Sequence, residues 1–156
     1  NSMWQRIQTV FLAMVVICMA VALFLPIGIF TDAAGNSHQL YPIHYTVVSN
    51  GVRTSTYFPY AFTSVLMAAV ATLAVISITK FENRITQIKI GTLNSLLLAG
   101  VMISVVLFLN PLARTYPGGK NGLVLYIAFA AVAFNWLSLR FIRRDEKLVR
   151  DSDRLR

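Results

Sequence analysis

The feature that most constrains this chain is a set of four long apolar stretches that contain no Asp, Glu, Lys, Arg or His. They cover residues 9–30, 58–79, 90–109 and 122–139. Each approaches or exceeds the ~20 residues that a helix needs to cross a hydrocarbon layer of ~30 Å. Residues 10–25 also lack the polar stripe, repeated every three or four positions, of a helix on a soluble bundle. The pattern therefore predicts an integral membrane protein and argues against a soluble domain.

We expect a single domain over residues 3–156, an all-α antiparallel bundle of four membrane-spanning helices. Residues 1–2 precede Met3 and look like a cloning scar, so they are left out of the fold. Residues 31–57 form the first outer loop, and residues 140–156 form a cytoplasmic C-terminal helix. Opposite charges four residues apart in this tail favour a helix. The apolar stripe of the tail either contacts the inner leaflet or a partner, or the tail is a solvated extension.

Sidedness follows from the distribution of Lys and Arg, which is the main determinant of topology. Eleven basic residues lie before the first stretch, between the second and third, and after the fourth, whereas Arg53, Arg114 and Lys120 lie on the other side. This split over short loops predicts that both termini are cytoplasmic. It also accounts for the net charge of +8 without nucleic acid as a partner.

The second half of the first outer loop carries the pattern of a β-hairpin. Asn50-Gly51 suits a two-residue type I′ turn, and the flanking residues are rich in Val, Thr and Tyr. An isolated hairpin is marginally stable in water, so we expect support from residues 37–41, from the second outer loop or from a partner. The candidate recognition residues of this loop are Tyr45, Asn50, Gly51, Arg53 and Tyr57.

Two strongly polar side chains occur inside the third and fourth stretches. Asn94 lies five residues from Lys89, and Asn135 lies five residues from Arg140. Both therefore lie at a depth of ~7–8 Å from the inner rim of the bundle. We expect Asn94 and Asn135 to face the bundle interior and to hydrogen-bond to each other or to a neighbouring backbone carbonyl.

A basic rim is predicted at the inner membrane surface, where it would attract anionic lipid. The alternative is that these residues only set the topology. The members of the rim are Arg6, Lys80, Arg84, Lys89, Arg140, Arg143 and Arg144.

The sequence offers little for catalysis or for a cofactor. Cys18 lies within the first stretch, where a thiol is unreactive. Asp32, His38 and His44 could converge on a metal, but the spacing of the histidines is not a recognised ligand pattern, and zinc takes three or four protein ligands. We therefore expect no enzyme activity, no cofactor and no metal.

Two terminal segments resemble a known family. They are Trp4-Gln-Arg-Ile-Gln-Thr-Val-Phe-Leu12, which leads to Leu23-Phe-Leu-Pro26, and the close of the chain from Ile142 to Arg156, with Asp-Glu-Lys-Leu-Val and Asp-Arg-Leu-Arg. They are similar to the bacterial membrane proteins grouped as domain of unknown function 4293. The resemblance implies a small four-span protein of a bacterial inner membrane. It carries no activity, substrate or catalytic residue.

Four charge-free helices, a β-rich outer loop and a basic inner rim favour a structural, assembly or accessory protein. Such a protein would act through membrane lipids, through another membrane protein or through a second copy of itself. A transporter or channel component, possible through oligomerisation, is the alternative, although proton- or sodium-coupled transport normally needs buried carboxylates or broken helices at the midplane.

Overall fold

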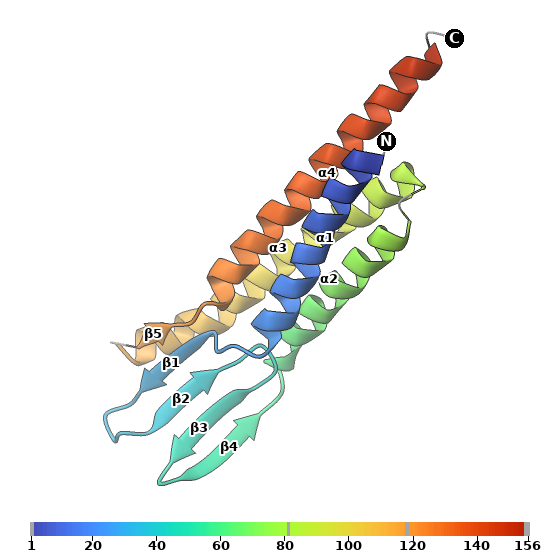
Figure 1. The fold of residues 1–156 in the computed structure, drawn as a ribbon. Helices are drawn as coiled ribbons and strands as arrows, with labels where there is room; N and C mark the ends of the chain where they lie inside the picture. Colours follow the sequence, from blue (N-terminus) through green and yellow to red (C-terminus); the bar gives the residue numbers. More distant parts are fainter. Residues whose placement is uncertain (1, 81, 118, 155–156) are drawn as a thin grey trace.

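The computed structural model describes residues 2–80, 82–117 and 119–154, without the side chains of residues 2–6 and 121. Four helices and five strands follow one another along this part of the chain (Figure 1). Their order is α1 (Ser2–Leu23), β1 (Gly28–Thr31), β2 (Ser37–Leu40), β3 (Tyr45–Ser49), β4 (Val52–Thr56), α2 (Ala61–Thr79), α3 (Arg84–Thr115), β5 (Lys120–Asn121) and α4 (Val124–Arg154).

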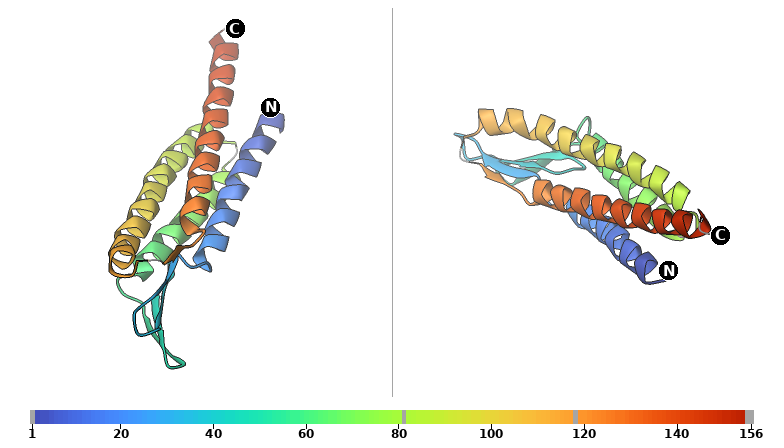
Figure 2. Two further views of the ribbon diagram at one scale, coloured as in Figure 1. Left: turned by 90° about the vertical axis from the view of Figure 1, so that its left-hand side faces the viewer. Right: turned by 90° about the horizontal axis from the view of Figure 1, so that it is seen from above.

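The helices pack side by side, and the strands form one layer at one end of them. α1 and α3 each contact both α2 and α4. Figures 1 and 2 show the strands at one end of the helices, which we call the sheet end. Both termini and the α2–α3 turn lie at the opposite end, the tail end, where α4 extends furthest.

The predicted all-α fold is wrong, because the molecule contains a five-stranded antiparallel sheet of order β4-β3-β2-β1-β5. The predicted set of four equivalent spans also needs correction. Within the described residues, α2, α3 and α4 are long and apolar enough to cross a membrane, whereas the apolar helix Ile7–Leu23 is shorter. The architecture is thus a helical bundle with three candidate membrane spans and a sheet.

The first apolar stretch does not remain helical to residue 30. α1 ends at Leu23, and Pro26, which cannot donate a backbone hydrogen bond, separates it from β1. The last apolar residues enter the sheet, where the side chains of Ile27 and Phe30 are buried. Their hydrophobicity thus serves packing within the protein, and a helical span over residues 9–30 does not form.

The predicted hairpin is present, but it supplies only two of the five strands. Asn50 and Gly51 both have positive φ, at 51° and 80°, as a type I′ turn requires. The register places Tyr45 opposite Thr56. β2 pairs with β3 on the other side, so residues 37–40, from one of the three supports considered, hold the hairpin.

The link between α3 and α4 is held against the sheet. α3 continues through Pro111 to Thr115, and β5 then pairs with β1. The backbone N–H of Gly122 donates to the carbonyl of Ile27 over 2.7 Å. This link therefore joins the third and fourth helices to the sheet edge opposite β4.

Both later helices extend beyond the apolar stretches that predicted them. α3 begins at Arg84 because the Asn83 side chain accepts a hydrogen bond of 3.1 Å from the backbone N–H of Thr86, which caps the helix. α4 runs without interruption from Val124 to Arg154. The predicted fourth span and C-terminal helix are therefore one element.

We predict that Gly122→Ala destabilises the fold by more than ~1 kcal/mol, because an added methyl group would collide with the backbone carbonyl of Pro26. Thermal unfolding in detergent micelles measures this effect. Gly100→Ala is the matched control, since its methyl group would lie 3.6 Å from Leu66, an ordinary contact. Equal stability of the two variants would contradict the close approach at Gly122.

Candidate functional site

The bundle has an apolar core, but it also buries several polar side chains and exposes many large apolar ones. Buried positions include Gln87, Asn94 and Asn135, each 1% exposed. Large apolar side chains point outward on every helix; examples are Ile17, Val65, Leu96, Leu107 and Phe129. Soluble proteins rarely expose so many apolar side chains together, and such surfaces mark contact with a membrane or a partner. The distribution is consistent with a membrane protein.

Asn94 and Asn135 both face the bundle interior, where their amide nitrogens donate to groups on neighbouring helices. The Asn94 amide donates to the carbonyl of Val70 on α2 over 3.2 Å. The Asn135 amide donates to the carbonyl of Gly91 over 3.1 Å and to the Ser95 hydroxyl over 2.9 Å, both on α3. The two asparagines thus join α3 to its two neighbours.

A third buried amide follows the same geometry and was missed by the sequence reasoning. Gln87 donates to the carbonyl of Ser77 over 2.8 Å. Gln87 and Asn94 are seven residues apart, and so are their acceptors Ser77 and Val70 on the antiparallel α2. The two hydrogen bonds are therefore compatible with the same register of α3 against α2. The seven-residue spacing of the amides was the available signal.

Some buried polar atoms on the tail-end half of the bundle have no hydrogen-bond partner among the described residues. They are the amide nitrogen of Gln8, the hydroxyl of Ser77 and the amide oxygens of Gln87, Asn94 and Asn135. Nearer the sheet end, the hydroxyls of Thr63 and Ser104 satisfy each other over 2.9 Å. The polar atoms without a partner therefore lie toward the tail end of the bundle.

A buried ion pair at the tail end was also missed. Arg84, at the start of α3, contacts the carboxylate of Asp145 on α4 over 2.5 Å, and Asp145 is 3% exposed. Asp145 lies within a run of charged residues that suggests a solvated face, so no local pattern indicates its burial. The pair removes Arg84 from the surface that could hold a lipid.

At the sheet end, a histidine links three elements. His38 on β2 contacts Asp32 through Nε2 over 3.0 Å and the Tyr45 hydroxyl through Nδ1 over 2.5 Å. Its ring stacks on Tyr116, which follows α3, with centroids 4.3 Å apart. Tyr45 in turn stacks on Tyr60, just before α2. This cluster ties the sheet to the helices.

Two pKa values reflect this environment. The hydrogen bond from His38, followed by the backbone N–H of Asn36, lowers the pKa of Asp32 to about 2. Burial raises the pKa of Tyr45 to about 12. The Asp32 carboxylate is therefore ionised and the Tyr45 phenol protonated at neutral pH, which suits a fixed structural network.

The residues considered for a metal divide between two clusters. Asp32 and His38 contact each other, whereas His44 bonds to Thr46 over 2.6 Å and packs against the rings of Tyr41 and Tyr57. Within the described residues, no group of three or more His, Cys, Asp and Glu side chains could hold a metal ion.

The five candidate recognition residues do not form one surface patch. Tyr45 is half-buried in the His38 cluster. Asn50 and Gly51 occupy the exposed turn, and Arg53 lies on β4, whose five residues are all exposed. Tyr57 follows the sheet and contacts the His44 ring. Arg53 alone of the five lies on the open edge strand.

The residues of the predicted basic rim differ in their surroundings. Lys80 and Lys89 are exposed, and the Arg6 side chain lies outside the described residues. Arg144 already takes part in another interaction. Arg140 and Arg143 are exposed and line the same hollow.

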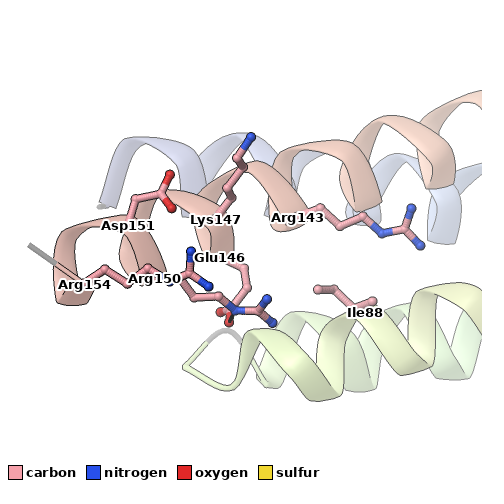
Figure 3. A pocket seen from close by; sticks show the side chains of 7 residues that line it. All are labelled: Ile88, Arg143, Glu146, Lys147, Arg150, Asp151 and Arg154. Atoms are coloured by element: carbon pink, nitrogen blue, oxygen red, sulfur yellow. Dashed lines mark hydrogen bonds and ion pairs between the residues drawn. The ribbon is translucent and has the colours of Figure 1, made fainter.

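Two neighbouring hollows at the tail end share Arg143. The smaller, of about 300 Å³, is lined by Trp136, Leu139, Arg140 and Arg143. The larger, of about 420 Å³, lies between α4 and Ile88 of α3, and Figure 3 shows Arg143 apart from the other charged side chains around it. The larger hollow is lined by Ile88, Arg143, Glu146, Lys147, Arg150, Asp151 and Arg154.

The family is decided by a match over nearly the whole chain. A family model described as domain of unknown function (DUF4293) matches residues 4–155. The chain belongs to this family. No curated protein matches it. The resemblance drawn from the terminal segments is thereby confirmed, and membership brings no activity or site residues to the DUF4293 chain.

We predict that Asp145→Ala destabilises this DUF4293 protein by ~3 kcal/mol, because it leaves the Arg84 charge partly buried and unpaired. The double variant Arg84→Met/Asp145→Leu should recover most of that loss, since an apolar pair avoids the desolvation cost. Chemical unfolding in mixed micelles gives both values. Glu146→Ala breaks the more exposed pair with Arg150 and should cost less than ~1 kcal/mol. Equal effects of the Asp145 and Glu146 variants would refute the buried pair.

Proposed function

We propose that this chain is an accessory or assembly protein of a bacterial inner membrane that acts by contact and not by catalysis. Its partner, an extended segment of another membrane protein, adds a strand to the sheet at β4. The observation that carries this proposal is the open β4 edge, whose residues are all exposed. Addition of a strand to such an edge is a recurrent mode of peptide recognition.

The register of the hairpin identifies the backbone groups available to the partner. In a two-residue hairpin the residues next to the turn, Ser49 and Val52, each donate a backbone hydrogen bond to the other. Hydrogen-bonded and non-hydrogen-bonded pairs then alternate along the two strands. Arg53 and Ser55 therefore direct their N–H and C=O groups away from β3. Protected edges carry charged side chains (especially Lys), Pro or a bulge; β4 has no Lys or Pro, and Arg53 is its one charged residue.

The proposed topology places the tail end in the cytoplasm and the sheet end outside it. The concentration of Lys and Arg at the tail end supports this orientation. α1 lies alongside the three candidate spans, and its outward side chains Val10, Ile17 and Val21 are apolar. The sheet then faces the periplasm, where a partner can reach β4.

Photo-crosslinking tests the partner site. A photoreactive phenylalanine analogue at position 53 should form an adduct with another membrane protein in native membranes, whereas the same group at the exposed helix position Leu96 should label lipid. Ser55→Pro should reduce the adduct about 5-fold by removing one outward N–H, because a main-chain hydrogen bond contributes ~1 kcal/mol.

The matched control for Ser55→Pro is Ser55→Ala, which removes only the hydroxyl that contacts Thr46. The proline should leave the β3 ladder intact, because the Ser55 N–H faces outward. Adducts with lipid alone, or equal adducts from the proline and alanine variants, would overturn the proposal. An adduct with a second copy of the chain would instead assign β4 to self-association.

A component of a transporter or channel is the second candidate, and the unpartnered polar atoms of Gln87, Asn94 and Asn135 favour it. Water that reached these atoms would satisfy them. The test compares Asn94→Cys with Met67→Cys, a buried position, in a Cys18→Ser background. If the bundle is closed to water, both cysteines should react equally slowly with a small water-soluble thiol reagent. Much faster reaction at position 94 would favour the transport function.

A further inference from the structure

We propose that the smaller hollow at the tail end binds the headgroup and upper acyl chain of an anionic phospholipid. Arg140 and Arg143 would hold the phosphate, and Trp136 and Leu139 would contact the acyl chain. The inference rests on the proposed placement of α4 across a membrane. It does not depend on a partner at β4.

The position of these residues along α4 matches the profile of a bilayer. Trp136 is 56% exposed, and tryptophan prefers the boundary between hydrocarbon and headgroups. Arg140 and Arg143 lie ~6 Å and ~10 Å further along the helix toward the tail end. The guanidinium groups are thus level with lipid phosphates when the indole is at the boundary.

Both guanidinium groups are available to an anion. Among the described residues, neither Arg140 nor Arg143 has a carboxylate within ion-pair distance. The two acidic residues that follow Arg143 most closely on α4 are engaged, since Asp145 pairs with Arg84 and Glu146 pairs with Arg150. The Arg140 guanidinium instead lies over the Trp136 ring, 5.5 Å from its centroid, which keeps it beside the hollow.

The spacing of the two arginines suits one phosphate group. Side chains three residues apart on a helix are neighbours, so two guanidinium groups can converge on the same anion and relieve their mutual repulsion. Arginine binds phosphate oxygens through paired N–H donors. The cationic amine of a zwitterionic lipid would be repelled, which favours phosphatidylglycerol or a similar anionic headgroup.

The apolar wall of the hollow favours a lipid over a soluble phosphate. Leu139 is 7% exposed and packs where Gly91 has no side chain, so α4 and α3 approach closely beneath the hollow. Trp136 extends this wall toward the hydrocarbon. The larger hollow contains Glu146 and Asp151 besides its basic residues, and these carboxylates disfavour a second anion there.

Native mass spectrometry of the full chain tests the site with phosphatidylglycerol and phosphatidylcholine of the same acyl chains. Arg140→Gln/Arg143→Gln should weaken phosphatidylglycerol binding by about 10- to 30-fold, because each basic residue near the surface contributes ~1 kcal/mol. The matched control Lys147→Gln/Arg154→Gln removes the same charge further along α4, leaves the Glu146–Arg150 pair intact and should retain binding within about 3-fold.

Two further arms separate recognition of a lipid from simple charge attraction and from binding of a soluble phosphate. Trp136→Ala should also reduce phosphatidylglycerol binding without a change in charge, and glycerol phosphate at the same concentration should not compete. Arg140→Lys/Arg143→Lys keeps the charge and tests binding if the glutamine variant fails to fold; it should bind more weakly than the unmodified chain. Equal losses in the two glutamine variants, equal binding of the two lipids, or competition by glycerol phosphate would overturn the proposal.

Discussion

A backbone N–H or C=O group left unpaired in hydrocarbon costs several kcal/mol, and this constraint decides where the chain can be helical and where it can be extended. Helices satisfy these groups internally and can face lipid. An open sheet cannot, and β4 leaves the outward groups of Arg53 and Ser55 unpaired within the described chain. With the candidate spans placed across a membrane as proposed, the sheet must lie beyond the hydrocarbon layer. The end of α1 at Leu23 and the turn of the chain around Pro26 accomplish this separation.

The same cost explains how the buried polar side chains of the bundle are used. Gln87 and Asn94 each donate to a carbonyl of α2, and Asn135 donates to a carbonyl of α3. Such bonds are individually weak, ~0.6 kcal/mol on average, but a shift of α2 along α3 would break the first two together. The main contribution of these hydrogen bonds is therefore to fix the register of α2 against α3. Arg84 and Asp145 add a stronger and more specific constraint between α3 and α4.

The sequence predicts those parts of the fold that depend on local patterns. The β3–β4 hairpin follows from Asn50-Gly51 and the residues that flank it. β1 and β5 could not be predicted in this way: β1 continues an apolar run that favours a span, and β5 has two residues held by pairing with β1. The burial of Asp145 and the bonding of His38 depend on residues distant in sequence. Sequence periodicity and spacing indicate which face of a helix or strand is buried and where the element ends. Contacts such as these depend instead on how the elements pack against one another.

The length of α4 connects the two ends of the molecule. Its 31 residues span ~46 Å, which exceeds a hydrocarbon layer of ~30 Å. One end joins β5 and hence the sheet, so the excess must project at the tail end, as Figure 2 shows. In the proposed placement, Trp136 marks the boundary, Arg140 and Arg143 occupy the headgroup layer, and Arg150 and Arg154 extend into water, where ions screen their charges. In that placement, the arginines of α4 face different surroundings. The depth of a basic residue, more than its charge, then decides whether it can hold a lipid.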